Sequence, residues 1–306
     1  MRRCSRKSRA RPEFCSGASP LRLAFLVPPP DYHLDWAWTF DPQADAVRQM
    51  GATVDPVDWT SDADFGAYDL VLPLIAWGYH QQFAKWQAVL DRFERDAVRV
   101  ANPVPVLRWN GDKSYLAELH GKGVATVPSL AFETIDDSAL AEARELFGSA
   151  ELVVKPLVSA SAYGTFRIGP GDPLPDQVRG WRMLVQPWLK DIVNSGEYSL
   201  IFFDGEFSHS VSKVPRPGEF RVQPEYGGII GRCDPPPGSI ELAKAALAAA
   251  PAATIYARID VVVGNDGGLQ VIELELIEPA LFMADAPGAG PRFAQAVLSA
   301  AKAGRE

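Results

Sequence analysis

Short apolar runs alternate with segments of helical periodicity over the first hundred residues of the chain. The run LRLAFLV (21–27) stops at three prolines, which is typical of a buried strand. Segment 41–51 opens with Asp-Pro and ends with glycine, and apolar residues recur at helical spacing in 81–95, so both segments predict helices. Strands are predicted in the runs 52–59 and 68–77. This alternation predicts an α/β domain that ends at a proline-rich boundary.

The rest of the chain is richer in predicted strands. A helix is predicted over 111–124, where Asp112 is placed to cap the first turn, and another over 239–249. The remaining apolar runs predict strands, at 151–158, 165–169, 182–189 and 198–214 and in a hairpin at 257–279. We expect four parts: a disordered basic tail (1–20), an N-terminal α/β domain (21–107), a central lobe (108–186) and a C-terminal lobe (187–306) that carries the hairpin.

The hairpin ARIDVVVGNDGGLQVIELELIEP combines strand-forming residues with an unusual number of charges. Turn formers at 265–268 predict two antiparallel strands. The register that pairs Gly264 with Leu269 puts aliphatic side chains on one face of the sheet, and a slip by one residue would bury carboxylates among them. In this register Val261 pairs with Ile272, Ile259 with Leu274, Asp260 with Glu273 and Arg258 with Glu275. Three carboxylates and one guanidinium therefore share the other face.

A face with three acids and one base predicts a cation site. Oxygen ligands without histidine or cysteine favour Mg²⁺ or Mn²⁺ over zinc, and Mg²⁺ often completes its shell with water and a substrate phosphate. Two other readings are open on the hairpin alone. The face could be an ordinary solvated one with cross-strand ion pairs, or two of the acids could form the dyad of a glycoside hydrolase.

A candidate phosphate site lies upstream, in VVKPLVSASAYGT (153–165). Lys155 ends an apolar strand, and a loop of small residues with Ser159, Ser161 and Gly164 follows it. A lysine is a point charge for phosphate, and the N–H groups of such a loop can close over phosphate oxygens. Serine and glycine loops are also common connectors. The segment therefore supports a phosphate site only in combination with the acidic face of the hairpin.

Charge and cysteine content narrow the classes of partner. The 306-residue chain has a formal net charge of -8, although its first twenty residues carry six arginines or lysines and one acid. A nucleic-acid or membrane partner bound through overall charge is not expected, whereas a small anionic ligand is compatible. Cys4 and Cys15 lie in the tail and Cys233 in the body, so neither a disulfide framework nor a cysteine zinc site is predicted. A cytoplasmic protein is expected.

These motifs, in this order, resemble the ATP-grasp superfamily from Leu21 to about Phe282. The resemblance implies an N-terminal α/β domain and two α+β lobes that enclose ATP. It also implies that Lys113 and Lys155 contact phosphates, that the SASAYG loop covers them, and that Glu197 binds the ribose. The connection between the lobes, whose backbone would meet adenine, is matched by Gln186, Pro187, Trp188 and Leu189.

The hairpin is similar to that of the D-alanine:D-alanine ligase-like enzymes in this superfamily. The resemblance gives Arg258 a catalytic role and makes Asp260, Glu273 and Glu275 metal ligands. Glu275 departs from the usual pattern, which has asparagine there. The run 196–228 most resembles the glutathione-synthetase-like branch, in which basic residues at the positions of Lys213 and Arg221 are candidates for holding the substrate carboxylate or the transferred phosphate.

The resemblance implies an ATP- and Mg²⁺-dependent ligase that activates a carboxylate as an acyl phosphate for attack by nitrogen. Within the branch it is closest to the O-ureido-serine cyclo-ligases of D-cycloserine biosynthesis. Alternatives are an intermolecular carboxylate-amine ligase and an ATP-binding sensor without turnover. The expected partner is a small amino-acid-like substrate, with a homo-oligomer as a further possibility. Candidate substrate contacts are Trp77, Tyr79, His80 and Glu278.

Overall fold

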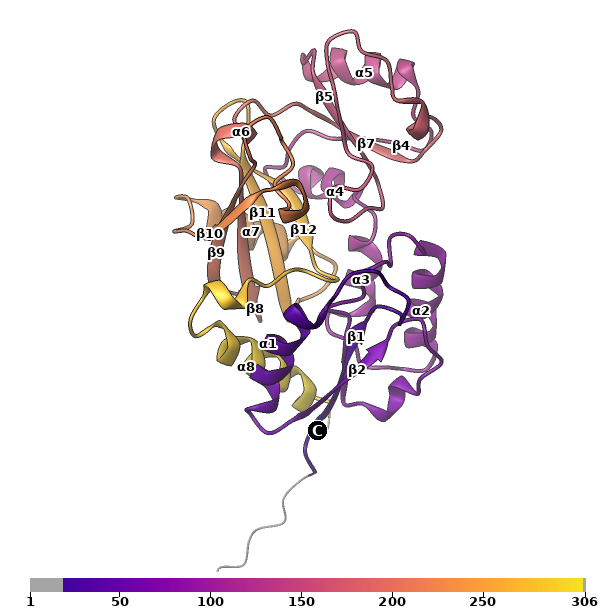
Figure 1. The fold of residues 1–306 in the computed structure, drawn as a ribbon, viewed down its shortest axis with the longest axis vertical. Helices are drawn as coiled ribbons and strands as arrows, with labels where there is room; N and C mark the ends of the chain where they lie inside the picture. The colour runs from indigo at the N-terminus through magenta and orange to yellow at the C-terminus, as the bar shows by residue number, and fades with distance from the viewer. Residues whose placement is uncertain (1–18, 305–306) are drawn as a thin grey trace, which may run out of the picture.

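The protein is described by a computed structural model that covers residues 19–304, and it contains three β-sheets (Figure 1). The predicted basic tail lies outside the described residues except for Ser19 and Pro20. In the described part of the chain, no helix is long and apolar enough to cross a membrane.

The first sheet is parallel and has the order β2-β1-β3. Its strands are β1 (Arg22–Val27), β2 (Thr53–Asp58) and β3 (Leu70–Leu72), and its helices are α1 (Ala37–Arg48) and α2 (Phe83–Arg95), with the short helix η1 (Phe65–Ala67) between β2 and β3. Leu23 and Phe25 pack with α1 in one apolar cluster, whereas Ala24 and Leu26 pack with α2 in another. Side chains that alternate along β1 thus bury both faces, as expected for a parallel sheet.

The second sheet is antiparallel, with the order β4-β7-β5-β6. It comprises β4 (Leu130–Phe132), β5 (Leu152–Pro156), β6 (Phe166–Ile168) and β7 (Met183–Pro187), together with α5 (Asp137–Phe147) and η2 (Asp176–Val178). Asp136 caps α5 by accepting the backbone N–H of Ala139 at 3.0 Å. This lobe stands at one end of the molecule, as Figure 1 shows, and has its own small apolar core.

The third sheet is antiparallel, with the order β10-β9-β8-β11-β12. Its strands are β8 (Glu197–Phe203), β9 (Glu206–Val214), β10 (Ile229–Arg232), β11 (Tyr256–Val263) and β12 (Leu269–Glu275). The remaining helices are α3 (Val104–Asn110), α4 (Tyr115–Gly121), α6 (Ile192–Ser195), α7 (Ser239–Ala248), α8 (Ala289–Lys302), η3 (Pro224–Tyr226) and η4 (Met283–Asp285). One face of this sheet packs against α4 and α7 in an apolar core. Its other face packs in part against α8, where Phe203 and Phe293 have ring centroids 5.5 Å apart, and otherwise carries the site described below.

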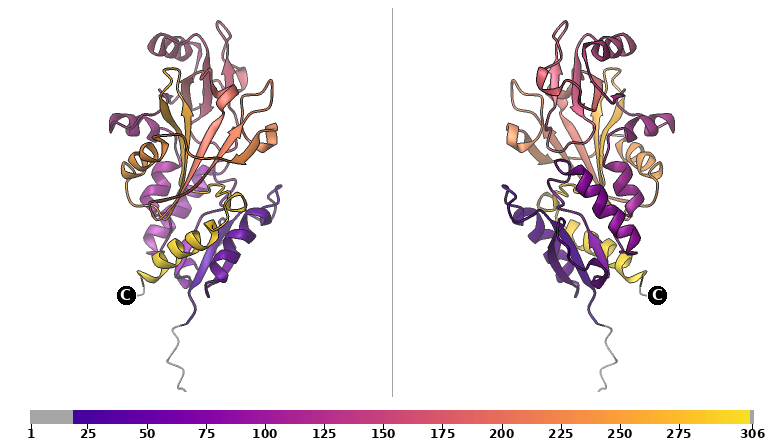
Figure 2. Two further views of the ribbon diagram at one scale, coloured as in Figure 1. Left: turned by 90° about the vertical axis from the view of Figure 1, so that its left-hand side faces the viewer. Right: turned by 90° about the vertical axis from the view of Figure 1, so that its right-hand side faces the viewer.

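The C-terminal helix α8 returns to the N-terminal unit. It packs against α1, and Phe293 lies edge-on to Phe25 of β1 with ring centroids 6.4 Å apart. Both side views of Figure 2 show α8, in yellow, beside the indigo and purple elements of the first sheet. The division into domains at residues 107 and 186 stays a prediction.

Several element predictions are wrong in detail. The strand predicted over 68–77 is shorter, since β3 covers only Leu70–Leu72. The helix predicted from Asp41 begins earlier, at Ala37, whose N–H is accepted by Asp35 at 3.0 Å. The expected boundary at 101–109 contains α3, because Pro103 is its N-cap and Pro105 lies in its first turn, where no backbone donor is needed. The helix predicted over 111–124 starts only at Tyr115. Asp112 accepts the Ser114 N–H in the turn before it, while the Lys113 N–H donates to the carbonyl of Leu157.

Asn102 joins the first sheet to the third. Its buried amide donates to the carbonyls of Tyr256 and Leu276 at 2.9 and 2.8 Å, and its oxygen accepts from Ile255 N–H at 2.7 Å. Asn102→Ala leaves these buried backbone groups unpaired, so we expect a loss of about 3 kcal/mol or more of unfolding free energy. Urea denaturation measures this loss, with exposed Asn194→Ala as the matched control. Equal midpoints for the two variants would contradict it.

Candidate active site

One cavity of about 550 Å³ collects the predicted site residues from all three sheets. Those that line it are Lys113, Lys155, Ser159, Ser161, Gln186, Pro187, Trp188, Leu189, Glu197, Lys213, Arg221, Arg258, Asp260, Glu273, Glu275, Trp77, Tyr79, His80 and Glu278. The exception is Gly164. It has φ +67°, and a Cβ there would lie 2.8 Å from the Pro156 ring, so it lets the loop turn close to β5 rather than lining the cavity.

The predicted hairpin register is correct at the charged end and wrong beyond it. Arg258 pairs with Glu275 and Asp260 with Glu273, as expected. A β-bulge then shifts the pairing, so that Val261 faces Val271 instead of Ile272. The extra residue turns Ile272 out of the aliphatic core and toward the cavity, where it packs near Trp188 and Leu189. Ile272 is a lining residue that alternation alone assigned to the opposite face.

Three carboxylates converge on the cavity side of the hairpin. Ligand oxygens of Asp260, Glu273 and Glu275 all lie within 4.8 Å of one another, so the three residues could hold a metal ion. Arg258 bridges two of them, since it donates to Asp260 from Nε at 3.0 Å and also contacts Glu275. The buried hydroxyl of Ser199 donates to Asp260 as well. This all-oxygen set is that of a hard divalent cation.

The acids of this cluster differ in their tendency to hold a proton. Burial raises the pKa of Glu275 to about 7, with the Arg258 guanidinium opposing it. Burial acts on Asp260 too, but the adjacent Arg258 and Lys213 outweigh it and hold the pKa of that carboxyl below its usual range. Lys113 and Lys155 likewise outweigh burial and lower the pKa of Glu273. Asp260 and Glu273 therefore favour the ionised form more strongly than Glu275 does.

A second ion-pair group extends the cluster across β8 and β9. The Lys213 amine lies 3.1 Å from Asp260 Oδ2 and also contacts Glu197 on the neighbouring strand. Burial raises the pKa of Glu197 to about 8, and the charge of Asp260 adds to the effect. Glu197 and Lys213 were predicted for separate roles from distant motifs. Strand pairing brings them together, because Glu197 and Lys213 are direct partners in the sheet.

The two lysines of the central lobe lie in different surroundings. The Lys113 amine donates to the carbonyl of Ser159 at 2.8 Å and pairs with Glu273 at 2.8 Å, so it joins the small-residue loop to the hairpin. Lys155 lines the cavity, and its amine has no hydrogen-bond or ion-pair partner within residues 19–304. Burial lowers the pKa of Lys155 to about 8. An unpaired cation in a cavity is a binding group for an anion.

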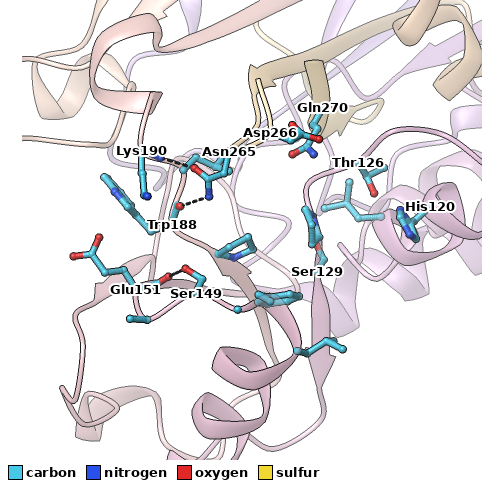
Figure 3. A pocket seen from close by; sticks show the side chains of 18 of the residues that line it. His120, Thr126, Ser129, Ser149, Glu151, Trp188, Lys190, Asn265, Asp266 and Gln270 are labelled. Carbon is cyan, nitrogen blue, oxygen red and sulfur yellow. Dashed lines mark hydrogen bonds between the residues drawn. The ribbon is translucent and has the colours of Figure 1, made fainter. Parts of the chain in front are cut away.

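The hairpin turn makes hydrogen bonds to the connection between the lobes, on the side away from the main cavity. Asn265 donates from Nδ2 to the Trp188 carbonyl at 2.8 Å and accepts the Lys190 N–H at 3.0 Å, as the dashed lines in Figure 3 show. This view looks into a second cavity of about 870 Å³, on the far side of the connection. The Trp188 ring also lies 3.9 Å from the Arg167 guanidinium. These contacts fix the strand end that forms one wall of the main cavity.

Arg221 lies at the cavity wall and is held by local partners. It donates to Glu219 from Nε at 3.0 Å, and its guanidinium lies 3.7 Å from the Tyr226 ring centre. Its charge, through the side-chain hydrogen bond, lowers the pKa of Glu219 to about 2. Part of its charge is therefore already compensated, unlike that of Lys155.

Aromatic residues of the N-terminal unit close the opposite end of the cavity. The segment after β3 supplies Trp77, Tyr79 and His80, and Tyr32 and Trp38 pack on Trp77 with ring centroids 6.3 and 6.1 Å away. Sequence analysis missed Tyr32 and Trp38, although they follow a strand that ends at a binding edge. The buried His80 Nδ1 has no partner within the described residues, and burial lowers the His80 pKa to about 4. His80 is therefore neutral at pH 7.

Comparison with known proteins agrees with this geometry. Residues 26–102 match a family described as the N-terminal domain of D-cycloserine synthetase DcsG. The cycloserine biosynthesis protein DcsG of Streptomyces lavendulae is 30% identical over 282 residues, which span 85% of this chain and 93% of that protein.

Solved structures similar to this chain also include ATP-grasp ligases and DcsG itself. The crystal structure of D-cycloserine synthetase DcsG has a TM-score of 0.80 at 27% identity, covering 92% of this chain and 99% of that one. D-alanine--D-alanine ligase of Bacillus anthracis complexed with ATP has a TM-score of 0.68 at 16% identity, covering 94% and 99%, and so shares the fold. The chain belongs to the DcsG family, has the α/β architecture of ATP-grasp ligases and is an ATP-dependent, C–N bond-forming ligase.

Proposed function

We propose that the protein closes the ring of O-ureido-D-serine to give D-cycloserine, using ATP and a divalent cation. The observation that carries this proposal is the single cavity in which three carboxylates, an unpaired lysine and an aromatic wall face one another. Such a cavity offers places for a metal, a triphosphate and a small amino acid. Membership of the DcsG family supports the choice of substrate.

In this proposal the nucleotide lies between the second and third sheets. Lys155 and Lys113 hold phosphates, and the loop with Ser159, Ser161 and Gly164 covers them. The adenine ring lies against Ile272 and the connection formed by Gln186, Pro187, Trp188 and Leu189, and Glu197 binds the ribose. The apolar cluster around Trp188, Leu189 and Ile272 supports this orientation, because it offers an apolar wall to the adenine ring.

Asp260, Glu273 and Glu275 would hold Mg²⁺ or Mn²⁺. Their oxygens are close enough to share one ion, and their type suits a hard cation. A cation bound there would neutralise phosphate oxygens during transfer. Glu275 adds an ionisable group where related enzymes have asparagine, and Arg258 compensates it through direct contact.

The proposed reaction has two chemical steps, which are followed by one hydrolysis. The substrate carboxylate attacks the γ-phosphorus of ATP, giving an acyl phosphate and ADP. The nitrogen bonded to the side-chain oxygen then attacks the acyl carbon, so a C–N bond forms, the acyl C–O bond to phosphate breaks and phosphate leaves. One water molecule removes the ureido carbonyl as CO₂ and ammonia. Within this scheme Arg258, Lys213 and Arg221 stabilise the charge of the transferring phosphoryl group or hold the carboxylate.

The substrate occupies the aromatic end of the cavity in this proposal, with Trp77, Tyr79 and His80 as contacts. A neutral His80 with a free ring nitrogen is a hydrogen-bonding group for the ureido amide, which carries no charge. Enclosure by the N-terminal unit would also keep water from the acyl phosphate.

Incubation with ATP, Mg²⁺ and O-ureido-D-serine tests the proposal. We expect stoichiometric ADP and a ring-closed product by mass spectrometry, and much slower turnover of the L-enantiomer. ADP release only when a separate amine is added would favour an intermolecular ligase instead. Failure of every amino-acid carboxylate to release ADP would overturn the proposal.

The affinity for ATP should fall above pH 8. Lys155 has a pKa of about 8 in the free protein, and bound phosphate stabilises its ammonium form, so binding takes up a proton at higher pH. Linkage limits the loss to about tenfold per pH unit. Calorimetry below and above pH 8, in buffers of different ionisation enthalpy, measures both the fall in ATP affinity and the proton uptake. Glu197 titrates in the same range, so Lys155→Arg, which keeps its charge, is the control; equal pH dependence in this variant would contradict the role of Lys155.

A further inference from the structure

Glu278 differs from the other acids around the cavity because it is half-buried and has no cationic partner within residues 19–304, whereas Glu225 and Asp285, which also lack an ion pair there, are exposed. Asp260 and Glu275 contact Arg258, Glu273 pairs with Lys113, and Glu197 contacts Lys213. Within residues 19–304, Glu278 has neither an ion pair nor a hydrogen bond, although its side chain lines the cavity. A half-buried carboxylate in such a place is costly unless a ligand supplies the missing positive charge.

The surroundings of Glu278 add to the need for a positive charge from a ligand. Burial raises its pKa well above the usual range, and the charge of Glu275 adds to the effect while Arg258 opposes it. The tyrosine hydroxyls nearby respond to the same charge. Burial raises the pKa of Tyr79 and of Tyr32, and the Glu278 carboxylate raises both further. Glu278 thus interacts electrostatically with the charged cluster and with the tyrosines of the aromatic end.

The missing cation is more compatible with an organic ammonium group than with a metal ion. Asp260, Glu273 and Glu275 form a set whose ligand atoms lie close together, and Glu278 is not a member of it. The rings of Tyr32 and Trp77, which pack on each other, line the same cavity as Glu278. Aromatic faces beside a carboxylate are favourable surroundings for an ammonium group.

The proposed reaction places an ammonium group next to the reacting carboxylate, since an α-amino acid carries both on one carbon atom. The protein group that binds the ammonium and the one that binds the carboxylate must therefore be neighbours with charges of opposite sign. Arg258 and Glu278 meet this condition, because they carry opposite charges and line the same cavity.

We propose that Glu278 binds the α-ammonium group of the amino-acid substrate. The carboxylate is held by the cations of the cluster and the side chain by the aromatic end, so the three contacts together select one enantiomer. This inference rests on the proposed function, which it extends to a specificity-determining residue.

The test compares O-ureido-D-serine with its des-amino analogue, 3-(ureidooxy)propanoate, in the wild type and in Glu278→Gln. We expect the variant to raise KM for O-ureido-D-serine about a hundredfold, with kcat changed less than about fivefold, because a charge pair made equally in ground and transition states is lost. Preference for the ammonium-bearing substrate should disappear. Exposed Glu206→Gln, at the first residue of β9, is the matched control.

An unchanged KM with full preference for the α-amino acid would overturn the assignment. A large fall in kcat at constant KM would also overturn it and indicate proton transfer instead. If Glu278→Gln does not fold, Glu278→Asp keeps the charge and should raise KM while retaining the preference; a lost preference would count against the inference.

The inference can fail separately from the proposed function. If the wild type closes no ring, calorimetry with ADP and Mg²⁺ compares D-serine with 3-hydroxypropanoate. A preference for D-serine that Glu278→Gln abolishes supports the ammonium site although the substrate is wrong. No preference in the wild type overturns both the site and the inference.

Discussion

Glu273→Gln should lower kcat by about 10³-fold or more while leaving the fold intact. The substitution keeps the size of the side chain but removes one of the three charges that face the cavity. It also removes the 2.8 Å ion pair with Lys113, which holds the small-residue loop through the Ser159 carbonyl. Loss of electrostatic stabilisation at a transferring phosphoryl group has effects of this size. Steady-state ADP release with O-ureido-D-serine measures it.

The matched control is Asp266→Asn in the turn of the same hairpin. Asp266 is exposed and accepts the Gly268 N–H at 3.0 Å, a bond that asparagine also makes, so activity should stay near that of the wild type. Thermal unfolding of Glu273→Gln within a few degrees of the wild type would confirm that the fold is retained. Activity retained in Glu273→Gln would remove this residue from the metal site.

Arg258→Lys should lower kcat by about 10³-fold with little change in ATP affinity. The Arg258 guanidinium contacts Asp260 from Nε and Nη2 and reaches Glu275 across the hairpin. Lysine keeps the charge but cannot span both carboxylates with a planar fork. The lower kcat reflects weaker stabilisation of the transition state, because an arginine at the transferring phosphoryl group raises kcat by a factor of about 10³ or more. Single-turnover kinetics separates this step from nucleotide binding.

Arg232→Lys, on exposed β10, is the control and should behave as the wild type. Arg258→Met is less informative, because it removes the cationic partner of Glu275 and one of the two cationic partners of Asp260, and it destabilises the fold by about 3–5 kcal/mol. A weaker ATP affinity that accounts for the whole loss in Arg258→Lys would contradict a catalytic role. It would instead assign Arg258 to the organisation of the metal ligands.

Much of the fold followed from local patterns. The apolar run at β1, the hairpin turn and the paired charges of β11 and β12 were predicted because each depends on residues close in sequence. The helix starts were less accurate. Contacts with distant segments decided them, as the hydrogen bond from the Lys113 N–H to Leu157 illustrates: it removes residues 111–114 from the helix and turns Lys113 toward Glu273.

The bulge in β12 was not predictable from alternation. Strict alternation assigned Ile272 to the core, whereas the inserted residue moves it to the cavity near Leu189. The aromatic end was found only in part. Trp77, Tyr79 and His80 form a recognisable run, but Tyr32 and Trp38 are isolated in sequence, and packing on Trp77 is what brings them to the cavity.

The sequence by itself determined which charged side chains of the hairpin share a face, because the two-residue repeat of a strand is local and a slip would bury charges. Only the tertiary structure decided which charges are compensated. Lys113 reaches Glu273 and Lys213 reaches Glu197 and Asp260 from other elements, while Lys155 and Glu278 are left without partners among residues 19–304. Ion pairing depends on segments that meet only in the folded chain, so the two unpaired groups, which carry the proposals, became visible only there.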